Sequence, residues 1–145
     1  MIDNMGHPNR LGVWGWLGGG RWGLERYLYT LHRVTGLGLL LYFLLHIVVT
    51  SARAFGPGAW AASMGRVSGG VFVVGEFLVF AAFAFHAANG VRLVLVELGW
   101  AIGNPIEPVY PYRTSVHEQR PLALGIMVVA GLLVLAGGLD FFILH

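Results

Sequence analysis

The chain has 145 residues, of which 57% are hydrophobic and 11% are charged, and its mean hydropathy is +0.71. In soluble domains about a quarter of the residues are charged, so the composition excludes an ordinary soluble domain. The chain has no cysteine, which excludes disulfides, thiolate-bound iron–sulfur clusters and covalently attached c-type haem within it. All nine basic residues are Arg, and they stand singly at the ends of apolar blocks, which does not favour a nucleic-acid partner.

The first apolar block is expected to insert into a membrane without being cleaved. Residues 1–31 lack an apolar core followed by a small-residue cleavage site, which argues against a signal peptide. Arg33 and Arg53 then bracket nineteen uncharged residues. At ~1.5 Å per residue these cross the ~30 Å hydrocarbon core. This block predicts a transmembrane helix over about 31–54.

Two further blocks repeat the pattern. Residues 67–91 contain Glu76 as their only charge, and residues 121–139 contain none. Strands of a membrane barrel would alternate polar and apolar side chains, and these blocks do not. They predict helices over about 69–99 and 121–143. The expected fold is therefore an all-α membrane protein, one membrane-anchor domain of three transmembrane helices spanning residues 1–145.

The connections between the blocks differ in character. Gly56, Pro57 and Gly58 break the first helix, and Ala59–Met64 is expected to form a short interfacial helix. The segment Gly103–Pro121 holds four prolines, which predicts an extended surface loop that docks a partner.

The distribution of Arg predicts the orientation. Seven Arg lie in the N-terminal segment and the second connection, and two lie in the first connection. Cytoplasmic segments carry the excess of basic residues. We therefore expect a multi-pass protein of the inner (cytoplasmic) membrane, with the N-terminus in the cytoplasm and the C-terminus outside.

Two histidines, His46 and His86, lie deep in the first two helices. Ionisable residues inside a membrane are costly and mark functional sites, and a neutral imidazole can ligate haem iron. The alternative is a structural histidine that bonds a neighbouring helix. Each histidine shares its helix face with small or hydroxyl-bearing residues, which leaves a slot for a flat macrocycle or serves ordinary helix packing. These are Gly75, Ala82 and Gly90 for His86, and Thr35, Gly38 and Tyr42 for His46.

Two polar groups lie nearer the expected cytoplasmic surface. Arg92 follows His86 by six residues, about 9 Å along a helix. Its guanidinium is then within reach of haem propionates, which it could bind with two hydrogen bonds. The alternative is an interfacial Arg that extends its side chain to the membrane surface. Tyr29, Thr30, His32 and Arg33 form a cluster that can hold a quinone carbonyl and supply protons. The alternative for this cluster is a basic anchor with an aromatic belt.

Two motifs resemble a known family. Leu31–Gly36 reads LHRVTG and resembles the H-R-x-[ST]-G motif that opens the first helix of succinate dehydrogenase cytochrome b subunits. Phe85–Arg92 reads FHAANGVR and resembles the H-x-x-x-G-x-R motif of their second helix. Glu97 stands where the family often has an acidic residue. The resemblance covers about Tyr27–Gly99.

The resemblance implies roles for individual residues. His86 is expected to be an axial ligand of haem b, and Arg33 a residue of the quinone site with His32 as its neighbour, near a haem propionate or the quinone. The family often has Ser four positions before this Arg. Here that position is Tyr29, with Thr30 beside it, so the hydroxyl of the quinone site differs from the family pattern.

His46 departs from the single-haem members of the family. If Arg33 and Arg92 mark the same membrane surface, His46 lies about 20 Å below it and His86 about 9 Å below it. The depths of the two histidines therefore differ by roughly 10 Å. Two ligands of one iron must lie at nearly equal depth, so these two histidines are not expected to share a haem. We therefore expect two b haems, His86 and His46 each ligating one iron, with the opposite ligands donated by a second membrane anchor subunit or by a second copy of this chain. The alternative is one haem and a structural His46.

The resemblance implies the membrane anchor of a succinate:quinone oxidoreductase, together with a flavoprotein and an iron–sulfur subunit. Haem b and quinone are the expected cofactors, and succinate would be oxidised on another chain, so no catalytic residue is assigned here. Three alternatives stay open: the anchor of a quinol:fumarate reductase, a haem b cytochrome of another dehydrogenase or hydrogenase, and a haem-free anchor.

Overall fold

The computed structural model describes residues 23–103, 107, 110 and 118–144. Helix α2 (Leu24–Thr50) continues into a 3-10 turn, η2 (Ser51–Phe55). A short helix α3 (Pro57–Arg66) leads to α4 (Gly70–Glu97), and α5 (Arg120–Leu139) ends in a π-helical turn, η4 (Asp140–Leu144). No strand occurs among the described residues.

Three helical segments are long and apolar enough to cross a membrane. They are Leu24–Phe55, Gly70–Glu97 and Arg120–Leu144. The expectation of an all-α chain with three transmembrane helices is confirmed. The first helix begins at Leu24, earlier than the expected 31. The added segment is about two turns long, and an ion pair between Glu25 and Arg120 ties its beginning to the start of α5, which the sequence pattern could not show.

Glycine and proline set the helix starts. Gly56 and Gly69 precede α3 and α4 with φ of 98° and 116°, values that favour glycine. Pro57 and Pro121 stand in the first turns of α3 and α5, where the missing N–H costs nothing. The short helix expected over Ala59–Met64 lies within α3. The expected docking loop, Gly103–Pro121, lies mostly outside the described residues.

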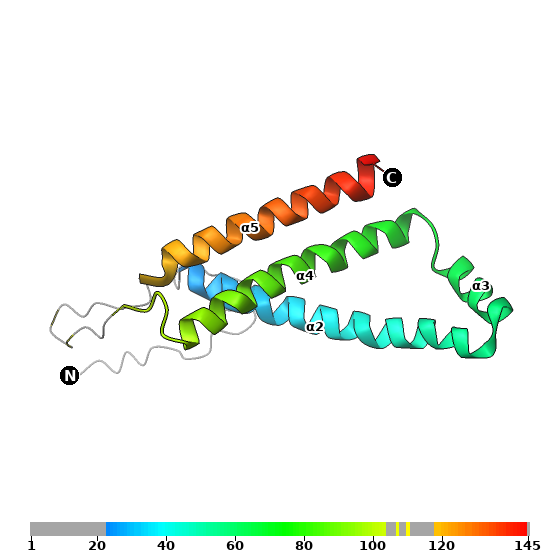
Figure 1. The fold of residues 1–145 in the computed structure, drawn as a ribbon, viewed down its shortest axis with the longest axis horizontal. Coiled ribbons are helices and arrows are strands. Elements are labelled where there is room, and N and C mark those ends of the chain that lie inside the picture. The colour runs from blue at the N-terminus through cyan, green and yellow to red at the C-terminus, as the bar shows by residue number, and fades with distance from the viewer. Residues whose placement is uncertain (1–22, 104–106, 108–109, 111–117, 145) are drawn as a thin grey trace, which may run out of the picture.

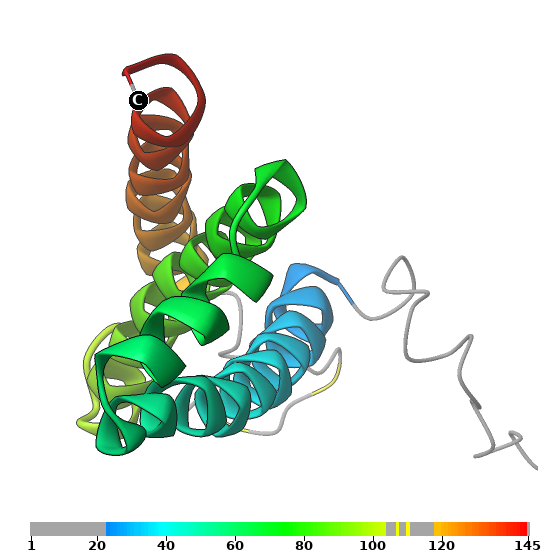
Figure 2. The same cartoon turned by 90° about the vertical axis from the view of Figure 1, so that its right-hand side faces the viewer.

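Helix α4 lies between α2 and α5, while α2 and α4 separate toward the end that α3 bridges (Figures 1 and 2). The core is thin, and its buried apolar members are Leu28, Ala84, Ala123 and Ala130. Small residues let α4 and α5 approach, since a Cβ on Gly137 would overlap the Phe80 ring. Most large apolar side chains face outward, as expected where lipid or a partner surrounds the helices.

Candidate haem and quinone site

His32 and His86 form a stacked pair between α2 and α4. Their ring centroids lie 3.9 Å apart and their planes differ by 8°. The His86 Nδ1 atom lies 3.1 Å from the main-chain oxygen of His32. The residue expected at the mouth of the first helix and the one expected deep in the second are therefore at the same level.

Gly36 closes one edge of this pair. A Cβ at position 36 would lie 2.9 Å from His86 Cε1 and 3.4 Å from His86 Nδ1. On the other helix, a Cβ at Gly90 would lie 3.8 Å from His32 Cε1. Gly38 and Gly75 are among the small residues named from the sequence, and a Cβ added at either position would meet no atom within 4 Å. The slot for His86 is thus made by Gly36, which the motif contains but the helix-face argument missed.

Arg33 and Tyr29 contact one another on the exposed side of α2. Arg33 Nη1 donates to the Tyr29 hydroxyl at 2.9 Å, and the guanidinium carbon lies 5.4 Å from the Tyr29 ring centroid. The two residues lie one turn apart in the helix, so they present a guanidinium and a phenol side by side. Tyr29 stands at the sequence position where the family pattern often has Ser, and its hydroxyl contacts Arg33.

Several buried polar atoms lack partners near this end of the bundle. Within the described ranges, the buried side-chain nitrogen and oxygen atoms without a hydrogen bond are Arg26 Nε, Thr30 Oγ1, His32 Nδ1 and Asn89 Nδ2. Buried polar groups are normally satisfied, and exceptions point to water or a bound group. All four belong to the first third of α2 or the last third of α4.

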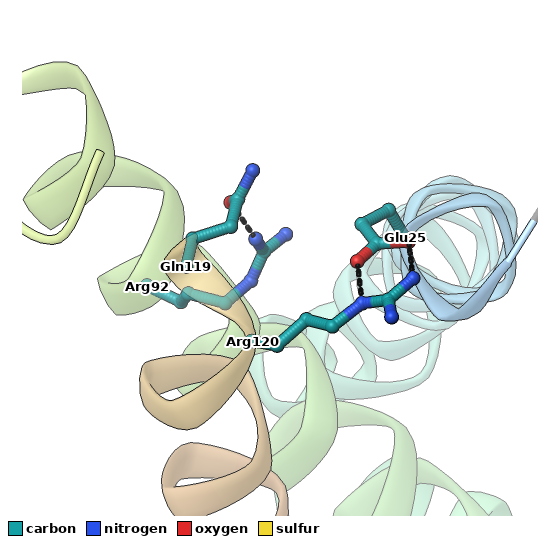
Figure 3. A network of polar contacts seen from close by, with 4 residues as sticks. All are labelled: Glu25, Arg92, Gln119 and Arg120. Carbon is teal, nitrogen blue, oxygen red and sulfur yellow. Dashed lines mark hydrogen bonds and ion pairs between the residues drawn. The ribbon is translucent and has the colours of Figure 1, made fainter. Parts of the chain in front are cut away.

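A polar junction joins the start of α2, the last turns of α4 and the start of α5. We define it as Glu25, Arg92, Gln119 and Arg120 (Figure 3). Arg92 is 4% exposed and donates from Nη1 to Gln119 Oε1 at 2.8 Å. Its Nε donates to Asn89 Oδ1 at 2.9 Å. Arg120 Nε lies 2.7 Å from Glu25 Oε1. The Arg92 side chain is therefore held toward the start of α5.

His46 lies apart from this site. It follows His32 by fourteen residues, about 21 Å along α2, and the structure brings no other histidine beside it among the residues described. Its Nδ1 is 3.5 Å from the Tyr42 hydroxyl, and its side chain is exposed. Because His32 stacks on His86, the separation of His46 from His86 is about twice the roughly 10 Å expected from the Arg markers.

A cleft of about 410 Å³ opens between the separating halves of α2 and α4. Its polar lining comes from Tyr42 and Glu76. The remaining lining is apolar and comes from Leu39, Phe43, Val79, Phe80, Phe83 and Phe141.

The donor set at His86 fits a haem ligand. A ligating histidine normally donates its other ring N–H to a carbonyl or carboxylate, which leaves one nitrogen with its lone pair for the metal. The His32 carbonyl oxygen can only accept, so the 3.1 Å contact places the proton on His86 Nδ1. In a neutral ring protonated at Nδ1, the lone pair of Nε2 would be available to bind a metal.

The three long apolar helices, with paired histidines between two of them, define a multi-pass membrane subunit. The chain belongs to the family described as succinate dehydrogenase/fumarate reductase transmembrane subunit, which matches residues 13–135. The expected family is confirmed.

A curated relative supports this membership. The chain is 24% identical over 123 residues to a protein of Mycobacterium tuberculosis described as succinate dehydrogenase 2 membrane subunit SdhC. The match covers 85% of this chain and 76% of the relative. No solved structure matches the chain.

Proposed function

We propose that this chain is the haem b-containing anchor of a succinate:quinone oxidoreductase, with His86 as an axial ligand of the iron. The observation that carries the proposal is the bond from His86 Nδ1 to the His32 carbonyl, which leaves the Nε2 lone pair available to a ligand, in a chain of this family. A bound haem would accept and return single electrons within the membrane. His32 and Gly36 hold the His86 ring from two sides.

Quinone is proposed to bind beside Arg33 and Tyr29, with His32 and Thr30 nearby. Quinone reduction takes up two electrons and two protons, so a guanidinium, a phenol and an imidazole suit the carbonyl that becomes a hydroxyl. The buried, unpartnered Thr30 Oγ1 and His32 Nδ1 support a polar ligand or water at this end. Arg92 remains a proposed propionate partner, although two of its nitrogens are engaged within the polar junction.

A second haem near the outer face is proposed on His46. An exposed imidazole inside a transmembrane segment is costly unless a cofactor or partner covers it. Its separation from the histidine pair by about 21 Å fits a separate iron rather than a shared one. On this proposal His86 and His46 each contribute one axial ligand, and a second membrane anchor subunit donates the opposite ligands.

The proposed complex includes a flavoprotein and an iron–sulfur subunit. The chain contains no cysteine, so the clusters that carry electrons from succinate must lie on another chain. We propose that this partner docks at the end bearing Arg33 and the polar junction, with that end in the cytoplasm.

Haem and flavin stoichiometry of the intact purified complex tests the proposal. We expect a flavin-bearing partner to co-purify and two b haems for each flavin. One haem for each flavin would remove the proposed role of His46 and leave that of His86. No haem in an assembled, flavin-containing complex would contradict the haem proposal as a whole.

A further inference from the structure

Thr35 makes a contact that its place in α2 does not require. Its hydroxyl oxygen lies 2.8 Å from the Leu31 carbonyl oxygen and 3.0 Å from the His32 carbonyl oxygen, in the same helix. The same oxygen lies 3.2 Å from His86 Nδ1, in α4. One hydroxyl therefore connects the backbone of α2 to the proposed haem ligand.

The direction of these bonds follows from counting hydrogens. Thr35 has one hydroxyl hydrogen, and the two carbonyl oxygens beside it can only accept. That hydrogen is therefore donated within α2, and the Thr35 oxygen accepts from the ring. The His32 carbonyl oxygen, 3.1 Å from Nδ1, also accepts. The carbonyl therefore requires the proton to lie on His86 Nδ1, and the Thr35 oxygen can share that proton as a second acceptor.

We propose that Thr35 is a positioning residue for His86: its hydroxyl supports the Nδ1–H tautomer set by the His32 carbonyl and fixes the ring orientation, which would leave Nε2 available to the iron. The inference rests on the proposed haem ligation by His86. Bonds of this kind to the second nitrogen orient metal-bound histidines and tune metal affinity. Gly36 lies next in the chain and bounds the same ring edge, so one short segment of α2 determines the position of the ligand.

The competing explanation is that Thr35 is an ordinary helix hydroxyl bonded to the preceding turn. Thr50 provides the internal comparison. Its hydroxyl donates to the His46 carbonyl oxygen at 2.7 Å and lies 3.2 Å from the Ile47 carbonyl oxygen. Within the part of the chain that the structure describes, it makes no bond to another helix. Replacing Thr50 thus removes the same local bonds without touching a histidine ring on another helix.

The experiment compares Thr35→Val, Thr35→Ser and Thr50→Val in the intact complex. Val keeps the size and branching of Thr and removes the hydroxyl, whereas Ser keeps the hydroxyl. The readouts are haem content per flavin, the low-temperature difference spectrum and the haem midpoint potential. We expect Thr35→Val to weaken haem retention by about 10- to 100-fold under haem-stripping conditions and to change the spectrum and the potential. Thr35→Ser should restore all three, and Thr50→Val should match wild type.

Wild-type haem retention, spectrum and potential in Thr35→Val would overturn the proposal. If Thr35→Val does not assemble, the smaller Thr35→Ala is judged by the same readouts. His86→Ala separates this inference from the proposed function. If His86→Ala retains the haem, the ligand assignment itself is wrong; if it loses the haem while Thr35→Val is unchanged, only the role of Thr35 is wrong.

Discussion

The α-carbon of Gly36 faces the edge of the His86 ring so closely that an added Cβ would lie 2.9 Å from His86 Cε1. Real Cβ atoms essentially never lie closer than 3.0 Å to such a neighbour. Because the ring is held on its face by His32 and at Nδ1 by α2, it has little room to move aside.

Gly36→Ala is therefore expected to displace His86 and lower the haem content of the complex. Gly38→Ala is the matched control, since a Cβ there meets nothing within 4 Å. Haem per flavin, measured on both purified variants, checks the prediction. Equal haem content in the two variants would show that the ring adapts and that the close approach is not needed for the cofactor.

Arg33→Leu should lower quinone reduction several-fold while succinate oxidation with a soluble artificial acceptor stays near wild type. The reason is that Arg33 lies with Tyr29 at the proposed quinone site, whereas succinate oxidation is proposed to take place on the flavoprotein. Arg66→Leu at the opposite end, in α3, is the control and should change neither rate. An equal fall in both rates in an assembled Arg33→Leu complex would argue for a docking role instead.

Gly137→Ala should destabilise the helix bundle by about 1–3 kcal/mol, the usual cost of overpacking. A Cβ at Gly137 would overlap the Phe80 ring, which packs between α4 and the end of α5. Gly131→Ala is the control, because nothing lies within 4 Å of its added Cβ. Unfolding of the purified subunit in a graded mixture of denaturing and mild detergent gives the difference. The prediction fails if the two alanine variants unfold together.

The polar junction offers a contrast between a buried and a partly exposed cation. Arg92→Leu leaves the fully buried Asn89 and the half-buried Gln119 without their partner, and an unsatisfied buried group such as Asn89 costs about 1–3 kcal/mol. Arg120→Leu removes an ion pair whose side chains are 39% and 20% exposed, which contributes about 0–1 kcal/mol. The same unfolding assay should find Arg92→Leu the less stable variant, and the reverse order would contradict this ranking.

The helices were predictable because uninterrupted apolar blocks have a fixed length in a bilayer. The start of α2 was placed late, because a charged residue marks the membrane surface but does not end a helix, and the Glu25–Arg120 pair joins segments far apart in sequence. Arg33 and Arg92 do not mark the same depth, although their places at the ends of apolar blocks predict that they do. Since His32 and His86 stack, Arg92 lies about 10 Å farther toward that end than Arg33.

The candidate ligand, His86, could be named from its motif, but its neighbours could not. Thr35 was grouped with His46 by helix spacing, yet it contacts His86, because the rotation of α2 against α4 is set by packing between helices. Asn89 lies within the second motif, and its complete burial beside Arg92 was not evident from spacing either. Contacts between helices depend on crossing geometry, which a single-helix pattern does not contain.

The reduced-minus-oxidised spectrum of the intact complex carrying His86→Ala tests the central claim most directly. The account predicts that the b-type signal of the haem at the histidine pair disappears, while flavin content and succinate oxidation with a soluble acceptor persist. His46→Ala, compared in parallel, should spare that signal because His46 lies about 21 Å away along α2. A full, spectrally unchanged b haem in assembled His86→Ala would contradict the account.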